Sequence, residues 1–229
     1  PKRTFGSLES RQSSGYLQNH LTNLGYTVEY IHFDARVGSR KRVGRNMVAL
    51  KQGKSPEVLA LIAHYDTAET TEQGAMKNGA AVGVLLELAR IFSQRPTHRS
   101  LLFVFSDGSE GGMLGAEDLA ENFAQKYGIA AVLSLDYVAS GDLASLRLDE
   151  TGQQSGFTPA WLRQLAIQAI QTQRIPVRSA SGLSESVERA FMIPRADQAP
   201  FLRAGIPAIN LGIISTDHSR ERALYHSPL

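Results

Sequence analysis

Apolar residues along this 229-residue chain recur with two periods, one typical of helices and one typical of strands. In the N-terminal half, apolar positions at helical spacing predict a helix that ends at Gly25 and a second helix over residues 80–93, which Pro96 follows. Short apolar or β-branched runs predict five strands, over residues 27–33, 46–50, 58–63, 101–105 and 130–135. The third of these runs is apolar at every position, which is typical of a strand buried on both faces of a mainly parallel sheet.

The C-terminal half continues the alternation with shorter elements. The predicted elements are helices over residues 114–127, 161–172 and 199–204, and strands over residues 175–178 and 208–211. Gly128 closes the first of these helices, and a Ser-rich stretch up to Met192 is expected to be a loop. Because strands and helices alternate, the crossovers should be right-handed and the centre of the sheet parallel. We expect one α/β domain over residues 1–229.

Composition narrows the class of protein. The chain is 42% hydrophobic and 20% charged, as globular proteins are, and its 24 Lys and Arg residues against 22 Asp and Glu residues give a net charge of +2. One basic cluster is too small for a nucleic-acid-binding face and is expected in a solvated loop. Its members are Arg36, Arg40, Lys41, Arg42 and Arg45. The absence of cysteine excludes a disulfide scaffold, a zinc ribbon and a thiol nucleophile.

Polar side chains gather where the buried strands end. They are His64 and Asp66 after the strand at residues 58–63, Asp107 to Glu110 after the strand at residues 101–105, Asp136 and Tyr137 after the strand at residues 130–135, and His226 near the C-terminus. Ligands of open parallel sheets bind beyond the carboxyl ends of the strands, so we expect these residues to meet at one edge. Imidazole and carboxylate groups are ligands for zinc. Asp66 is then expected to fix the tautomer of His64 rather than to bind the metal.

At this point the sequence resembles a known family. The motifs ALIAHYDT, GAAVGVLLELARIF, LLFVFSDGSEGGMLGAEDLAE, AVLSLDYV, DQAPFLRAGIPAINLG and LYHSP occur in the order typical of the M28 zinc aminopeptidases, a family with glutaminyl-cyclase-like members. The resemblance runs from about residue 46 to residue 228. It implies a three-layer sandwich, with helices on both faces of a mixed, mostly parallel sheet, and two zinc ions bridged by one Asp. It also implies that His64 and Asp136 correspond to ligands of one zinc ion, and Glu110 and His226 to ligands of the other.

Three positions depart from the family pattern. Lys77 stands at the position of the bridging Asp, and no neighbouring aspartate can take its place. Ser109 precedes Glu110 where the family has two consecutive glutamates, so a serine occupies the position of the general base. Asp197 is followed by Gln198 where the family commonly has Asp-His.

These departures bear on catalysis, because hydrolysis in the family implies a metal-bound water and a carboxylate base. A serine hydroxyl does not accept a proton near neutral pH, and loss of a positioned base costs on the order of 10²- to 10⁴-fold in rate. An ammonium about 4 Å from a divalent ion is repelled by roughly 8 kcal/mol at an effective dielectric constant near 20.

We therefore predict a site without metal, cofactor or catalytic residues, in which the ammonium of Lys77 is the counter-charge of Glu110 and Asp136. The vestigial ligands would be His64, Glu110, Asp136 and His226. Asp66 would contact His64 without being a ligand itself. The residues expected to line the cleft are Asp107, Tyr137, Asp197, Gln198 and Tyr225.

Two alternatives stay open at the level of sequence. In the first, the chain is an active metal-dependent aminopeptidase that removes N-terminal residues from peptides, either with one zinc ion held by His226, Glu110 and a neighbouring group, or with a base recruited from Asp107. In the second, Ser109 is a nucleophile, although the surrounding sequence lacks the first glycine of the G-x-S-x-G motif.

A domain of this kind without catalysis is expected to bind or scaffold a peptide or protein partner, and not nucleic acid. The sequence contains no secretory signal and no apolar run of membrane-spanning length. Because the chain begins at Pro1 rather than Met, we expect it to be a piece of a longer protein. The family resemblance places that protein outside the cytoplasm or among secreted proteins, with a soluble domain on a parent chain that is free or membrane-attached.

Overall fold

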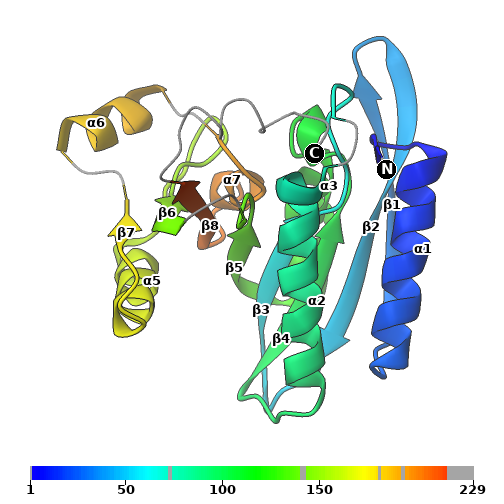
Figure 1. Ribbon diagram of the computed structural model, residues 1–229, viewed down its shortest axis with the longest axis horizontal. Coiled ribbons are helices and arrows are strands. Elements are labelled where there is room, and N and C mark those ends of the chain that lie inside the picture. The colour runs from blue at the N-terminus through cyan, green and yellow to red at the C-terminus, as the bar shows by residue number, and fades with distance from the viewer. Residues whose placement is uncertain (1, 72–73, 140–142, 180–181, 192–193, 216–229) are drawn as a thin grey trace.

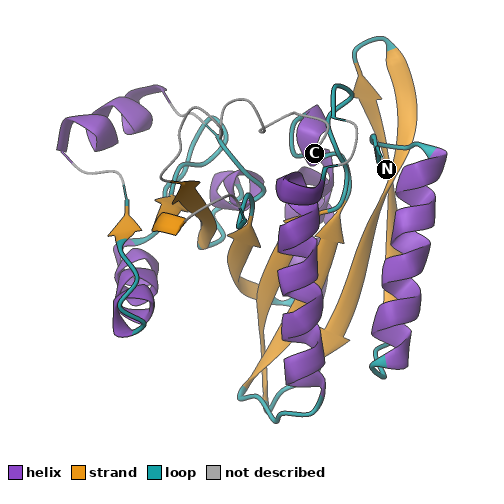
Figure 2. Ribbon diagram, viewed as in Figure 1, coloured by secondary structure: helices purple, strands orange, loops and turns teal. Residues whose placement is uncertain are grey.

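The computed structural model describes residues 2–71, 74–139, 143–179, 182–191 and 194–215 (Figure 1). Within these residues the chain forms one sheet of eight strands (Figure 2). The strands are β1 (Val28–Val37), β2 (Arg40–Lys51), β3 (Ser55–His64), β4 (Arg99–Ser106), β5 (Ile129–Leu135), β6 (Leu143–Asp149), β7 (Val177–Arg178) and β8 (Ala208–Ser215). Their order across the sheet is β1-β2-β4-β3-β5-β8-β6-β7. The neighbours β4, β3, β5 and β8 are parallel, and β2 and β6 flank them in antiparallel orientation.

Helices cover both faces of this sheet, so the architecture has three layers. On one face lie α1 (Leu8–Asn23), α2 (Ala80–Ser93) and α5 (Ala160–Thr172). On the other face lie α3 (Leu114–Asp118), η3 (Leu119–Phe123), α4 (Ala124–Tyr127) and α7 (Gln198–Arg203). Two short turns, η1 (Ala75–Gly79) and η2 (Ser109–Gly111), follow β3 and β4. The remaining helix, α6 (Gly182–Phe191), stands apart from the sheet in Figure 1.

Alternate side chains of β4 fill the two halves of the core. Phe103 packs with Leu85 of α2 on one face of the sheet, and Leu102 packs with Phe201 of α7 on the other. All four side chains are fully buried. A strand covered on both faces must be apolar at nearly every position, which explains the uninterrupted apolar runs. The carboxyl ends of β3, β4 and β5 are therefore fixed at one edge of a rigid platform.

The strongest sequence patterns predicted elements that the structure contains. α2 has the predicted bounds, and β3, β4 and β5 extend the predicted strands by a few residues. α5, α7, β7 and β8 also lie where short patterns predicted them. None of the helices in the described ranges is long and apolar enough to cross a membrane.

Two segments predicted as loops are regular structure. The basic cluster lies on a β-hairpin, because β1 continues to Val37 and β2 begins at Arg40. Arg36, Arg40 and Lys41 are exposed near the tip of this hairpin, whereas Arg42 donates a hydrogen bond to the carbonyl of Phe5 and Arg45 lies over the ring of Tyr30. The stretch before Met192 contains α6, because Leu183, Val187 and Phe191 recur at helical spacing between polar residues.

Two further details differ from the sequence prediction. β6 was not predicted, because its mixed apolar and polar residues show neither a continuous apolar run nor a clear turn signal. The single helix predicted over residues 114–127 is interrupted by η3, whose wider turn separates α3 from α4.

Candidate functional site

His64, the last residue of β3, is held between two carboxylates. Its Nδ1 lies 3.1 Å from Oδ1 of Asp66, and its Nε2 lies 3.4 Å from Oδ1 of Asp136. Asp136 directly follows β5, the hydrogen-bonded neighbour of β3, and all three side chains are buried. Burial opposes the charged imidazole, but hydrogen bonds and charges from Asp136 and Asp66 raise the pKa of His64 well above its ordinary value. The two carboxylates therefore favour the protonated form of the ring.

Lys77 brings a second cation into this edge of the sheet. Its Nζ lies 3.4 Å from Oε1 of Glu110 and 3.6 Å from Oδ2 of Asp136. The side chains of Lys77, Glu110 and Asp136 are 12%, 16% and 8% exposed, so the ion pairs are largely shielded from water. Burial raises the pKa of Asp136, but His64 and Lys77 outweigh that effect and hold the pKa below its usual range. Asp136 is therefore an ionised carboxylate with a cation on each oxygen.

Asn78 fixes the loop that carries Lys77. Its side-chain amide donates a hydrogen bond to the carbonyl of Leu135 at 3.0 Å, and its Oδ1 accepts one from the amide of Tyr137 at 3.2 Å. The Asn78 side chain is fully buried, and the peptide bond between Lys77 and Asn78 is cis. The loop is thus tied to the end of β5, which directs Lys77 toward Asp136.

Asp66 connects the end of β3 to the turn that presents Glu110. Besides its contact with His64, its Oδ1 accepts a hydrogen bond from the amide of Ser109 and its Oδ2 accepts one from the amide of Glu110, each at 3.1 Å. Gly108 precedes this turn with φ of 77°, a left-handed conformation that glycine adopts without strain. Asp66 therefore orients the imidazole of His64 and the backbone of the turn at the same time.

Ser109 donates its hydroxyl proton to a buried carboxylate. Its Oγ lies 2.7 Å from Oδ1 of Asp197, and the hydroxyl of Ser106 donates to Oδ2 of the same residue at 2.5 Å. Burial raises the pKa of Asp197, although its contacts with His64 and the two serines act against this shift. Sequence reasoning placed Asp197 in the cleft but missed Ser106, which is a small polar residue at the end of a buried strand and gives no distinctive signal.

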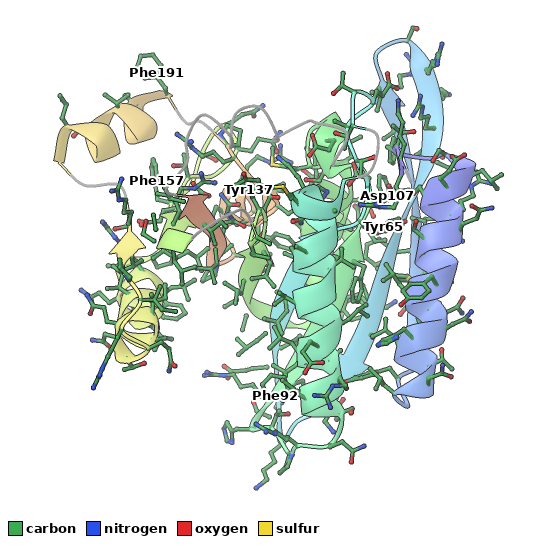
Figure 3. All side chains as sticks on the ribbon, viewed as in Figure 1. Tyr65, Phe92, Asp107, Tyr137, Phe157 and Phe191 are labelled. Carbon is green, nitrogen blue, oxygen red and sulfur yellow. The ribbon has the colours of Figure 1, made fainter. Side chains whose placement is uncertain are left out.

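Asp107 points away from this cluster, toward β2 and α1 (Figure 3). Its Oδ1 accepts a hydrogen bond from the hydroxyl of Ser10 at 3.4 Å, and its Oδ2 accepts one from the amide of Arg45 at 3.3 Å. Burial, followed by repulsion from Asp66, raises the pKa of Asp107 to about 7. The carboxylate that the sequence offered as a replacement base is thus engaged on the far side of β4.

Several other predicted cleft residues lie near the same edge. Tyr137 is buried beside Asp136 with φ of 56°, and its carbonyl accepts a hydrogen bond from the amide of Ile213. Gln198 is buried and donates to the carbonyl of Thr151 at 3.2 Å. His226 and Tyr225, predicted as a ligand and a cleft residue, lie outside the described residues.

Arg147 was missed by sequence reasoning. It lies on β6, and its charge contributes to the lowered pKa of Asp136. The unpredicted strand hid this residue, because a sequence pattern that does not place β6 beside β8 cannot place Arg147 near the cleft.

The described residues do not fit the two zinc ions that the sequence resemblance implies. The amine of Lys77 contacts both Glu110 and Asp136, one predicted ligand of each ion. Across the described ranges, no group of three or more His, Cys, Asp or Glu side chains is arranged to hold a metal ion. A bridging ligand must carry negative charge or a lone pair toward the metals, and a protonated lysine offers neither.

Sequence comparisons identify related proteins. The model of a family described as Peptidase family M28 matches residues 46–229. The alkaline phosphatase isozyme conversion protein of Escherichia coli (strain K12) is 30% identical over 166 residues, which cover 62% of this chain and 48% of that protein. The BOS complex subunit NCLN of Canis lupus familiaris is 27% identical over 187 residues, covering 75% of this chain and 33% of that subunit. The chain thus spans about half or less of the length of these relatives.

Solved structures share the fold. BSAP, a zinc aminopeptidase from Bacillus subtilis, superposes with a TM-score of 0.78 at 14% identity, over 99% of this chain and 84% of that one. The glutaminyl cyclase of Porphyromonas gingivalis superposes with a TM-score of 0.77 at 19% identity, over 99% of this chain and 83% of that one. These superpositions confirm the predicted α/β architecture, and the family match confirms the resemblance on which the site prediction depended.

Proposed function

The chain belongs to peptidase family M28, and from that premise we propose that its cleft is a metal-free binding site that no longer hydrolyses peptides. The observation that carries this proposal is the position of the Lys77 amine, 3.4 Å from Glu110 and 3.6 Å from Asp136. In this proposal the lysine performs the electrostatic task of the metal, which is to neutralise carboxylates gathered at the strand ends. No cofactor is then required, and His64, Glu110, Asp136 and His226 are vestigial ligands.

Charge counting supports the proposal. Three carboxylates, those of Asp66, Glu110 and Asp136, face two cations, His64 and Lys77. A divalent ion added beside Asp136 would bring the cationic total to four and would meet the ammonium at about 4 Å, with a repulsion of roughly 8 kcal/mol at an effective dielectric constant near 20.

The proton-transfer groups also argue against hydrolysis. Ser109 stands at the base position, and its hydroxyl is a donor to Asp197 rather than an acceptor facing the cleft. Asp107 has both oxygens engaged by Ser10 and Arg45, away from Lys77 and Asp136. Without a positioned base, an attacking water would keep its proton, at a cost on the order of 10²- to 10⁴-fold in rate.

Metal analysis of the purified chain tests the proposal. The wild-type protein is incubated with zinc and then dialysed into zinc-free buffer. It should retain far less than one zinc ion per chain, and a chelator should not change its melting temperature. The matched variant carries Lys77→Asp and Ser109→Glu, which restore the residue types of the family at both positions, and should retain zinc. Stoichiometric zinc in the wild type, with chelator-dependent stability, would overturn the metal-free proposal.

A specific distance favours a second candidate, an active metal-dependent aminopeptidase. Nε2 of His64 and Oδ1 of Asp136 are 3.4 Å apart. Two ligands of one tetrahedral zinc ion at about 2.0–2.1 Å are separated by roughly 3.3 Å, so this pair is spaced like a ligand pair. This candidate predicts release of a chromogenic amine from aminoacyl amides that a chelator abolishes. Absence of release with any added divalent metal would eliminate it.

We assign the chain to binding or scaffolding of a peptide or protein partner. The support is that one group of relatives carries the name of a complex subunit, the BOS complex subunit NCLN. The family resemblance further supports a location outside the cytoplasm for the parent protein. A peptide array read with the wild type and the Lys77→Asp, Ser109→Glu variant would test whether the cleft itself holds the partner.

A further inference from the structure

An apolar groove of about 490 Å³ lies on the sheet face that α2 and α5 share. Its floor is formed by Leu59 and Leu61 of β3 and Leu133 of β5, and one wall is formed by Trp161 and Leu165 of α5. Trp161 is 54% exposed and Leu165 is 56% exposed. The groove lies away from the cleft described above and shares no residue with it.

The groove is a place where the helical layer is incomplete. On the opposite face of the same strands, Ala60, Ile62 and Val132 are fully covered. Leu59, Leu61 and Leu133, which point into the groove face, are only half-buried. Central strands of a three-layer sandwich are ordinarily covered on both faces, and no helix within the described ranges covers this position.

α6 is a helix that lacks a surface to cover. Its apolar residues Leu183, Val187 and Phe191 are 82%, 43% and 72% exposed, and they lie four residues apart on one face. Figure 3 shows Phe191 on the outer part of α6, away from the sheet. At 1.5 Å per residue this stripe is about 12 Å long. The groove wall of α5 presents its lining residues at the same spacing, from Trp161 to Ala169, and has the same length.

α6 is tethered away from the groove of its own chain. It follows β7, the outermost strand, and the strands β6 and β8 separate β7 from the groove over β5 and β3. Beyond α6 the chain leads to α7, which is buried on the opposite face of the sheet. In the strand order of its own chain, α6 is thus separated from the groove by β6 and β8.

We propose that the chain forms a homodimer in which α6 of each copy docks into the α5 groove of the other. An apolar helix face and an apolar groove of equal length, both left open by the same chain, are complementary surfaces. Reciprocal docking uses both copies of each surface and closes the assembly at two subunits, as a two-fold interface does.

Trp161 reports on this contact, because it is the only tryptophan of the chain and lies in the groove. Sedimentation of the 229-residue chain should show a concentration-dependent dimer, with Trp161 emission shifting to shorter wavelength over the same range. Leu165→Glu in the groove and Val187→Glu on α6 should each raise the dissociation constant at least tenfold. The control Leu8→Glu changes a leucine that is 66% exposed elsewhere and should leave it unchanged.

A mixing experiment identifies the occupant. One variant keeps an intact α6 and the other keeps an intact groove, so a mixture of the Leu165→Glu and Val187→Glu proteins should associate more tightly than either alone. A monomer at every concentration would overturn the proposal, as would a dimer that survives both substitutions. A dimer lost with Leu165→Glu but kept with Val187→Glu would show that the groove holds something other than α6. Circular dichroism of each variant confirms that it is folded.

Discussion

Replacing Lys77 by methionine removes the ammonium from the cleft while keeping a side chain of similar length. In the wild type, His64 and Lys77 lie within 3.6 Å of the carboxylates of Asp66, Glu110 and Asp136, and in the Lys77→Met variant His64 keeps its contacts while the ammonium is lost; the charge of Arg147 acts on Asp136 in both proteins. Lys77 is 12% exposed, and its partners Glu110 and Asp136 are 16% and 8% exposed, so water cannot fully replace the lost charge. We expect the variant to be less stable.

The magnitude follows from the two distances. At 3.4 Å and 3.6 Å, each attraction is about 5 kcal/mol at an effective dielectric constant near 20. Desolvation of the lysine cancels a large part of this sum, and removing one partner of a buried ion pair typically costs about 3–5 kcal/mol. For a chain of this size, that loss corresponds to a fall of roughly 6–20 °C in melting temperature.

The assay is urea unfolding near neutral pH of the wild type, Lys77→Met, Glu110→Gln and the double variant. Because Lys77 and Glu110 contact each other, the double-mutant cycle should give a coupling of about 1–3 kcal/mol. Lowering the pH adds a second readout. The depressed pKa of Asp136 contributes stability that is fully present above the unfolded-state pKa and is lost as the pH falls toward the folded-state pKa; without Lys77 this acid-dependent loss should be smaller and should be complete at a higher pH. A variant as stable as the wild type, or a coupling near zero, would refute the counter-charge role of Lys77.

Further predictions concern neighbouring residues. Because the pKa of Asp107 is raised to about 7, the folded state binds its proton more tightly than the unfolded state. The free energy of unfolding should therefore fall as the pH rises from about 4 to 7, by up to about 1.4 kcal/mol per pH unit. That slope should be absent from pH-dependent urea unfolding of Asp107→Asn, and an unchanged slope would contradict the assignment. Asn78→Ala leaves the carbonyl of Leu135 and the amide of Tyr137 without their partner and should cost about 2–4 kcal/mol in urea unfolding. The control Asn122→Ala loses only an exposed contact and should cost less than about 0.5 kcal/mol, so equal losses in the two variants would show that burial of Asn78 is unimportant.

Elements with a continuous or strongly periodic apolar pattern could be predicted from the sequence because their periodicity admits one interpretation. α2 and the buried strands β3, β4 and β5 belong to this group, since their apolar side chains form the two halves of the core. β6 and α6 do not. The mixed residues of β6 are explained by its antiparallel pairing with β8, and α6 exposes its apolar stripe, so neither carries the pattern of a buried element.

The sequence by itself determined which chemical groups stand at the strand ends, because ordered motifs fix His64, Lys77, Glu110 and Asp136 relative to their strands. The tertiary structure decided what those groups do to one another. The parallel pairing of β3 with β4 and β5 brings residues from separate motifs within 3.4–3.6 Å, and it turns Asp107 toward β2 instead. Electrostatic energies change steeply over such distances and with burial, and neither quantity is encoded in any local stretch of sequence.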